Sequence, residues 1–294
     1  MKDISDKRVN ISLDNPSITF DKSKCDECGI CKNICKINVG VYEFSKDNYP
    51  CINCGSCTLA CPNKCLSEKD ETDKLEEYLH SNKVIVMQTA PAVRVSLGEE
   101  FGMKLGTNVE GKMITALRTI GADYVFDTTF GADLTVMEEA SELVNRIKTS
   151  KNLPMFTSCC PSWVKFCEMF YPEYLDNLST CKSPISMMGS VINNYFCKIN
   201  NLKREDIISI VIVPCTSKKM EILRYNDIDL AITTRELAKY LKKEKINLAK
   251  LKNSGYNSLL GKGSSGGIIF GTSGGVMELS LIHISEPTRP LYIS

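Results

Sequence analysis

The residues of this sequence most suited to chemistry are its cysteines. The chain has 15 cysteines in 294 residues, and most of them lie in one short stretch that holds a motif written twice, "CDECGICKNIC" and "CINCGSCTLACP". Each copy has the spacing C-x2-C-x2-C-x3-C. The first copy is Cys25, Cys28, Cys31 and Cys35, and the second is Cys51, Cys54, Cys57 and Cys61. Thiolates at this spacing are typical ligands of 4Fe-4S clusters.

The spacing also predicts which cysteines share a cluster. Three thiolates on a tight loop can bind one face of a cubane, whereas the fourth begins a short helix and points at the other cluster. We therefore expect one cluster on Cys25, Cys28, Cys31 and Cys61, and another on Cys51, Cys54, Cys57 and Cys35. Zinc is the alternative, because four thiolates can also bind a tetrahedral ion. Cys65 lies outside the motif, and we expect a structural role for it. The doubled motif resembles a bacterial-type ferredoxin, which would carry electrons and do no bond chemistry itself.

A second set of cysteines follows apolar, strand-like runs. In "FTSCCPSWVKF" two adjacent thiols, Cys159 and Cys160, precede a helix-like run. Neighbouring residues that leave a strand point in different directions, so we expect the two thiols to do different jobs. Cys215 follows another such run in "IVIVPCTSKKMEILR", and Ala90 and Pro91 end a third in "MQTAPAVRV".

The elements that position these residues are predicted by their periodicity. From about residue 83 onward, continuous apolar runs alternate with amphipathic helical patterns, which is typical of parallel sheets flanked by helices. In such α/β sheets, sites form at the carboxyl ends of the strands. We expect an α+β ferredoxin-like domain over 18–72, an α/β domain over 82–278 and a foreign or read-through tail over 279–294. The acidic, lysine-rich segment 67–83 is expected to be a solvated connecting helix.

Composition limits the possible partners. The chain is 43% hydrophobic and 24% charged, with 36 Lys and Arg against 35 Asp and Glu. This balance gives no electrostatic footprint for nucleic acid or an anionic membrane. The start, "MKDISDKRVN", lacks the apolar core of a signal peptide, and no run approaches the roughly 20 apolar residues that span a bilayer. We therefore expect a cytoplasmic protein whose cysteines serve metals or catalysis and do not form disulfides.

Taken together, three motifs resemble the FeFe-hydrogenases: the doubled cysteine motif, "TSCCPSW" and "PCTSKKME". The resemblance covers about residues 20–278. It implies the reversible reduction of protons to dihydrogen at an H-cluster, which is a 4Fe-4S cluster joined by a cysteine to a di-iron unit with CO, cyanide and a bridging dithiolate amine. It also implies a ferredoxin or similar electron partner and hydrogenase maturation factors. Ser162, Val213 and Ala92 depart from the residues that are commoner in the family.

The resemblance assigns roles residue by residue. Cys160 and Cys215 would bind the catalytic cluster, Lys218 would donate to a cyanide, and Ala90 and Pro91 would help to bind the cofactor. Cys159 would pass protons to the bridging amine. The remaining residues of the implied proton path are Glu139, Glu142, Arg146 and Ser179.

The same residues also have ordinary interpretations. The spacing of 139, 142 and 146 places them on one helix face, where they could be a surface ion pair. Lys218 and Glu221 could be helix-surface charges. A free cysteine is often a small buried hydrophobe, and we expect that of Cys167, Cys181 and Cys197.

The resemblance is incomplete at the carboxyl end. The family needs two further ligand cysteines, but this sequence has none after Cys215. After "GIIFGTSGGVME" it becomes "LSLIHISEPTRPLYIS", where prolines and β-branched residues disfavour the expected helix. We expect these 294 residues by themselves not to evolve hydrogen. An iron-sulfur electron carrier and a hydrogen-sensing or cluster-scaffold relative are the alternative functions; Cys159, Glu139 and Glu142 favour catalysis.

Overall fold

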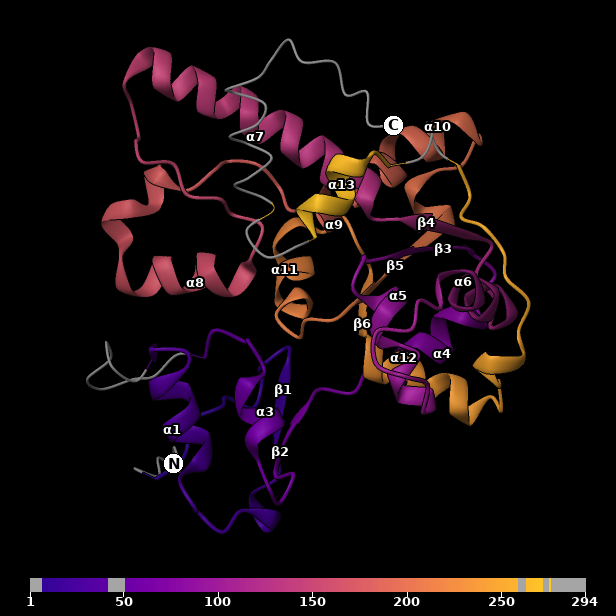
Figure 1. Ribbon diagram of the computed structural model, residues 1–294, viewed down its shortest axis with the longest axis horizontal. Helices are drawn as coiled ribbons and strands as arrows, with labels where there is room; N and C mark the ends of the chain where they lie inside the picture. The colour runs from indigo at the N-terminus through magenta and orange to yellow at the C-terminus, as the bar shows by residue number, and fades with distance from the viewer. Residues whose placement is uncertain (1–6, 42–50, 259–262, 272–274, 276–294) are drawn as a thin grey trace.

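A computed structural model describes residues 7–41, 51–258, 263–271 and 275. The chain forms a small amino-terminal module, which lies beside a larger α/β domain (Figure 1). The expected tail over 279–294 lies outside the described residues.

The amino-terminal module is built around its cysteines. Strand β1 (Ile18–Phe20) pairs antiparallel with β2 (Leu66–Glu68), and helices α1 (Ile30–Ile37) and α3 (Ser56–Ala60) follow the cysteine loops. Its core consists largely of thiols with a few aliphatic side chains, such as Val9, Ile18 and Leu66. So small an apolar core gives little stability on its own, and domains of this size usually need metals or disulfides.

The larger domain has a parallel sheet in the order β4-β3-β5-β6. The strands are β3 (Val84–Thr89), β4 (Tyr124–Asp127), β5 (Ile207–Val213) and β6 (Leu230–Thr233). Every residue of β5 is buried, as expected for a central strand covered on both faces. The predicted α/β class with helix-flanked parallel strands is confirmed.

Helices cover both faces of this sheet (Figure 1). One face packs in a hydrophobic core with α4 (Thr72–Leu79), α5 (Val93–Ser96), α6 (Glu110–Thr119) and α12 (Thr234–Lys243). The other face packs against α9 (Pro184–Val191) and the segment around Phe196 that leads into α10 (Cys197–Ile199). The alternation of β5 residues between these cores follows the two-residue period of a strand.

The remaining helices frame the carboxyl ends of the strands. Helix α7 (Thr129–Thr149) follows β4 and packs against α9, α8 (Pro161–Phe170) follows the adjacent cysteines, and α11 (Lys218–Tyr225) follows β5. Helix α13 (Ser265–Phe270) lies on α7. These helices therefore surround the edge at which the sequence places its candidate site residues.

Two local predictions differ from the structure. The sequence predicts a strand at "PMFTS", but Phe156 makes only an isolated bridge with Leu178. Within this run only Met155 is buried, so the run is not a strand covered on both faces. The connecting helix does form as α4, but it is not simply solvated. Leu75 is fully buried in the main core, and Tyr78 and Leu79 pack beside it.

Candidate functional site

The two cysteine motifs have the same backbone geometry. The residue before the second cysteine has a left-handed backbone in both copies, at Glu27 (φ 56°) and Asn53 (φ 66°). The residue after it is a glycine with φ near 80°, Gly29 or Gly55, which caps the following helix. Glycine adopts this conformation without a steric penalty. The repeated spacing therefore folds into a loop of the same backbone geometry in both copies.

A cavity in the module is lined by thiols from both copies. Cys51, Cys54 and Cys57 of the second copy line it together with Cys35 of the first. This is the quartet expected from the crossed pattern, and aliphatic side chains such as Val9 and Ile18 line the rest of the cavity. Burial raises the pKa of Cys35 to about 12 and also raises the pKa of Cys51, because buried surroundings disfavour the thiolate. The described residues thus fit a 4Fe-4S cluster at this position.

Cys65 lies beside the other expected quartet. Its sulfur is 3.1 Å from that of Cys61, and the residue is buried in the module core with Cys31 while Cys25 packs against that core. The structural role expected for Cys65 agrees with this burial, although its thiol is also within reach of a cluster ligand.

The second group of site residues meets at the carboxyl edge of the parallel sheet. The amide of Ala90, just after β3, donates to the carbonyl of Ile212 in β5 at 2.9 Å, so the ends of these strands lie side by side. Cys215 follows β5 after one proline. The ammonium of Lys218 donates to the carbonyl oxygen of Cys159 at 2.9 Å. This contact brings the loop of the adjacent cysteines to the turn that holds Cys215.

The adjacent cysteines differ in their surroundings. Cys160 is exposed and caps α8, with Pro161 as the first helical residue, whereas Cys159 is only partly exposed. Burial raises the pKa of Cys159 to about 11; Lys218 opposes the rise, and Glu139 adds to it. A thiol with this pKa keeps its proton at neutral pH. The two thiols thus lie in different surroundings, and their expected division of roles stays a prediction.

Lys218 is held by an acid that the residue pattern alone did not identify. Glu221, one turn along α11, is 3% exposed and accepts from Lys218 at 2.5 Å. Its other oxygen accepts from the hydroxyls of Ser183 and Ser186. The interpretation of Lys218 and Glu221 as surface charges is therefore wrong. The signal available in the sequence was the i, i+3 spacing, which does not distinguish a buried pair from an exposed one.

The residues of the expected proton path also come together. Glu142 accepts from Ser179 Oγ at 2.7 Å and from Arg146 Nη2 at 2.6 Å. Arg146 is itself buried and donates to several backbone carbonyls, among them that of Leu178 at 2.7 Å. Glu139 lies one turn earlier on α7 and is 1% exposed. The interpretation as a surface ion pair is wrong for this helix face.

The two glutamates have opposite pKa shifts. Burial raises the pKa of Glu139 to about 7, while the nearby Ser179 and the backbone of Ser158 partly oppose this. Among the described residues, neither carboxyl oxygen of Glu139 has a well-formed hydrogen bond. Burial also disfavours ionised Glu142, but hydrogen bonds from Ser179, Arg146 and Thr180 outweigh it and lower the pKa. One carboxyl is therefore poised to exchange a proton near neutral pH beside another that stays ionised.

The other cysteines of the larger domain behave in two ways. Cys167 and Cys197 are buried, as expected for small hydrophobes. Cys181 is only partly buried, and its thiol lies 3.7 Å from Glu142 Oε2. The expectation was therefore wrong for Cys181, because the loop that carries Ser179 also brings this thiol to the glutamate.

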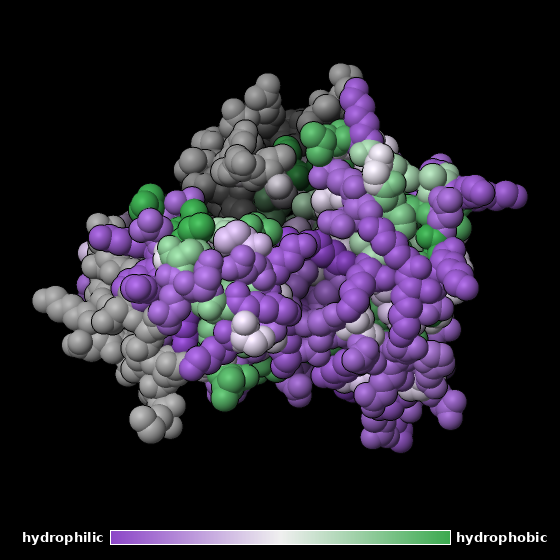
Figure 2. Space-filling model, turned by 90° about the horizontal axis from the view of Figure 1, so that it is seen from below, coloured by the Kyte–Doolittle hydropathy of each residue, from purple (hydrophilic) through white to green (hydrophobic). Residues whose placement is uncertain are grey.

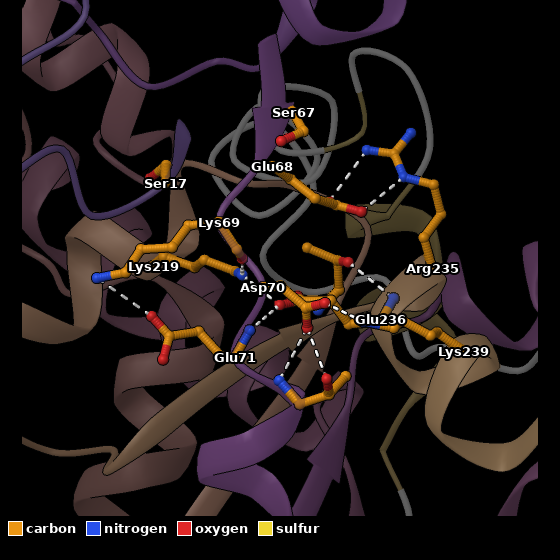
Figure 3. A network of polar contacts seen from close by, with 12 residues as sticks. Ser17, Ser67, Glu68, Lys69, Asp70, Glu71, Lys219, Arg235, Glu236 and Lys239 are labelled. Atoms are coloured by element: carbon orange, nitrogen blue, oxygen red, sulfur yellow. Dashed lines mark hydrogen bonds and ion pairs between the residues drawn. The ribbon is translucent and has the colours of Figure 1, made fainter. Parts of the chain in front are cut away.

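The segment that joins the two parts of the molecule is held by buried charges. Lys219 and Glu236, with side chains 4% and 3% exposed, form an ion pair of 2.6 Å. Lys219 also donates to the carbonyl of Lys69, and Glu236 accepts from the amide of Glu71 at 2.7 Å. Figure 3 shows this network with two further ion pairs, Arg235 with Glu68 and Lys239 with Asp70. Because Lys219 follows Cys215 closely, the network fixes the segment to the helix at the candidate site.

The surface on the module side is mainly hydrophilic. Figure 2 shows this face with small, separate hydrophobic patches. Within the described ranges, no helix combines the length and apolar character required to cross a membrane.

Comparisons with known proteins agree on one family. The family model for the iron only hydrogenase large subunit, C-terminal domain, matches residues 83–289, which extends beyond the boundary expected at 278. Iron hydrogenase 1 of Clostridium pasteurianum is 42% identical over 301 residues, which cover 94% of this chain and 52% of that protein. The periplasmic Fe hydrogenase large subunit of Nitratidesulfovibrio vulgaris is 44% identical, with 71% of this chain and 52% of that protein covered. The chain spans about half the length of these relatives.

A more distant relative has a different name, whereas a solved structure is again an FeFe-hydrogenase. Cytosolic iron-sulfur assembly component 3 of Bos taurus is 28% identical over 82% of this chain and 58% of that protein. A solved structure of an FeFe-hydrogenase that describes stepwise H-cluster assembly has a TM-score of 0.65 and 35% identity, and the match covers 72% of this chain and 56% of that one.

Proposed function

Because this chain belongs to the iron-only hydrogenase family, we propose that the protein catalyses the reversible reduction of protons to dihydrogen, with electrons relayed by two 4Fe-4S clusters. The observation that carries the proposal is the group formed by Glu142, Ser179, Glu139 and Cys159. It leads from the partly exposed Glu142 to the edge where Cys160 and Cys215 are placed. An electron carrier or a cluster scaffold has no need of such a group.

The pKa values in this group rise toward the site. The pKa of Glu142 is lowered, that of Glu139 is about 7, and that of Cys159 is about 11. A proton that reaches Ser179 and Glu139 therefore meets groups of increasing proton affinity, ending at a thiol that remains protonated. The Ser179 hydroxyl can both accept and donate, so it can link the two carboxyls.

The positions of Cys160, Cys215 and Lys218 support binding of the catalytic cofactor. Cys160 and Cys215 would each give a thiolate, and Lys218, oriented by Glu221, would give ammonium donors. Ala90 and Pro91 lie at the same edge. When bound, the cofactor would supply the metal at which protons are reduced by the relayed electrons. The chain's own residues would hold it and deliver the proton as far as the Cys159 sulfur.

The eight motif cysteines would hold the two relay clusters. Anaerobic reconstitution of the chain should give close to eight irons and eight sulfides, the sum for two cubanes. About four irons, or zinc in their place, would show that the module has a different role.

A form of the protein that also supplies the two further family cysteines tests the whole proposal. Expressed with hydrogenase maturation factors, it should evolve hydrogen from reduced ferredoxin or viologen. The cluster-assembly alternative, which is motivated by the 28% identical relative, predicts bound iron without hydrogen evolution. We further propose a ferredoxin-like electron partner and a cytoplasmic location.

A further inference from the structure

The second cysteine motif is clamped to the two loops of the catalytic edge. Ser162, two residues after Cys160, donates to the carbonyl of Ile52 at 2.9 Å. Thr216, directly after Cys215, donates to the carbonyl of Asn53 at 2.8 Å. These two hydrogen bonds tie Ile52 and Asn53 to residues that closely follow Cys160 and Cys215, the expected ligands of the catalytic cluster.

Asn53 is the centre of this contact. Asn53 is 0% exposed, and its backbone amide lies 3.3 Å from Cys51 Sγ. Its side-chain amide donates to Asn15 at 2.9 Å. Its remaining side-chain oxygen accepts from Lys165 Nζ at 2.9 Å. Every polar group of Asn53 is thus engaged, which fixes the position of the lysine that it receives.

Lys165 brings a positive charge from the catalytic domain to the second motif. It lies on α8, is partly buried, and donates at this interface to a neutral side chain. Its neighbour Glu168 is bound by Arg224 through two contacts of 2.8 and 2.6 Å. Within the part of the chain that the structure describes, no carboxylate forms an ion pair with Lys165. Asn53 places the ammonium near Cys51, because the same residue accepts from Lys165 Nζ at 2.9 Å and has its amide 3.3 Å from Cys51 Sγ.

The corresponding loop of the first motif has the opposite charge. Asp26 and Glu27 occupy the places of Ile52 and Asn53, and both are exposed. Lys24 is nearby, but it is exposed and paired with Asp21 at 2.9 Å. The buried Arg8 lies over the Phe20 ring, 4.2 Å from its centroid. Exposed charges are screened by water and salt, whereas a charge at a half-buried interface keeps more of its effect.

We propose that Lys165 raises the reduction potential of the second cluster above that of the first, so that electrons pass from the exposed end of the module toward the catalytic domain. Reduction adds a negative charge to a cluster, which a nearby ammonium favours and carboxylates disfavour. Net charge and solvent exposure are among the factors that set iron-sulfur potentials. This inference rests on the proposed function, because it requires two 4Fe-4S clusters in the module.

The experiment is a redox titration of the reconstituted 294-residue chain, followed by electron paramagnetic resonance. Lys165→Met removes the charge and keeps the length, Lys165→Arg keeps the charge, and Lys148→Met removes an exposed lysine on α7. Cys54→Ala identifies the signal of the second cluster. At a fixed potential, Lys165→Met should lower the ratio of reduced to oxidised second cluster about tenfold, which is 59 mV for a one-electron couple. The Arg and Lys148 variants should stay within a fraction of that shift.

Other outcomes overturn the inference. If Lys165→Met shifts neither cluster, or shifts both equally, the charge does not set the order of the two potentials. If Lys165→Arg behaves like Lys165→Met, packing and not charge is responsible. A loss of iron in Lys165→Met would show that Lys165 is needed for the fold of the module and does not simply tune the potential. Eight irons with unchanged potentials would reject this inference alone, whereas a wild-type chain without iron would reject the proposed function as well.

Discussion

The two cysteine motifs share ligand spacing and backbone geometry, yet the molecule places them in opposite surroundings. The loop of the first copy is exposed at Asp26, Glu27 and Cys28, whereas Ile52 and Asn53 of the second are buried against the catalytic domain. The spacing of the cysteines thus indicates which residues are ligands, and the residues between the ligands indicate which motif packs against the catalytic domain. The polar pair in "CDEC" is exposed to solvent, whereas the pair in "CINC" lies at the interface.

The same contrast recurs in the catalytic domain. Cys159 and Cys160 are adjacent but differ in exposure, and Glu139 and Glu142 share a helix face but have pKa values shifted in opposite directions. In each pair, tertiary packing gives two residues of the same type a different exposure or a different pKa shift. Each pair can therefore be tested by the same substitution at both members.

The largest difference is expected between the adjacent cysteines. Cys160→Ser removes a soft ligand and should deplete the catalytic cluster, because a hydroxyl is a poor substitute for thiolate on iron-sulfur iron. Cys159→Ser should leave the iron content almost unchanged. Iron analysis and the infrared bands of CO and cyanide measure this in a form with the full ligand set. If Cys159→Ser loses the iron and Cys160→Ser keeps it, the roles are reversed.

The two glutamates should give opposite pH dependences of stability. The folded pKa of Glu139 is raised from 4.5 to about 7, so its contribution is fully present below about pH 4.5 and is lost as the pH rises through 7. Relative to Glu139→Gln, the wild type should lose about 3 kcal/mol across this window. Glu142 has a lowered pKa; its contribution is present at neutral pH and is lost in acid. Denaturant unfolding of both Gln variants in acid and at neutral pH checks this, and parallel pH profiles would contradict it.

The two glycines test the unequal burial of the motifs directly. Both have φ near 80°, so alanine strains each backbone by about 1 to 2 kcal/mol. A Cβ on Gly55 would also lie 2.7 Å from Thr216 Oγ1, whereas on Gly29 the nearest atom is a carbonyl oxygen at 3.5 Å. We expect Gly55→Ala to lose about 2 kcal/mol more than Gly29→Ala, because overpacking adds to the strain. Equal losses of unfolding free energy in the two variants would mean that Thr216 can move to make room for the added methyl group.

The smallest effect is expected from one interface hydrogen bond. Thr216→Val keeps the shape but removes the donor to the buried carbonyl of Asn53, which should cost about 1 kcal/mol. Thr119→Val is the matched control, since its hydroxyl also donates to a carbonyl, that of Thr115, but at an exposed position of α6. The control should change the unfolding free energy by less than about 0.5 kcal/mol. Indistinguishable variants would show that water replaces the bond at the interface.

The sequence predicted local features better than tertiary ones. The repeated cysteine loops, the helix after Cys160 and the parallel sheet depend on spacing and periodicity, which are visible in the residues. The burial of Glu139, the support of Lys218 by Glu221 and the contact of Cys181 with Glu142 depend on segments distant in sequence. The proton path was expected only from the family resemblance, because i, i+3 and i, i+4 spacing does not show whether a helix face is buried.

The most direct test is the rate of hydrogen evolution per bound iron of Cys159→Ser, measured in the form that carries the full ligand set. Serine releases a proton far less readily than a thiol, so delivery should stall while the metal site is intact. General acid-base groups contribute about 10² to 10⁴-fold to rates, and we expect a loss near the upper end, with Cys159→Asp recovering part of the activity. A Cys159→Ser protein with full iron and an unchanged rate would contradict the assignment of Cys159 as the final proton donor.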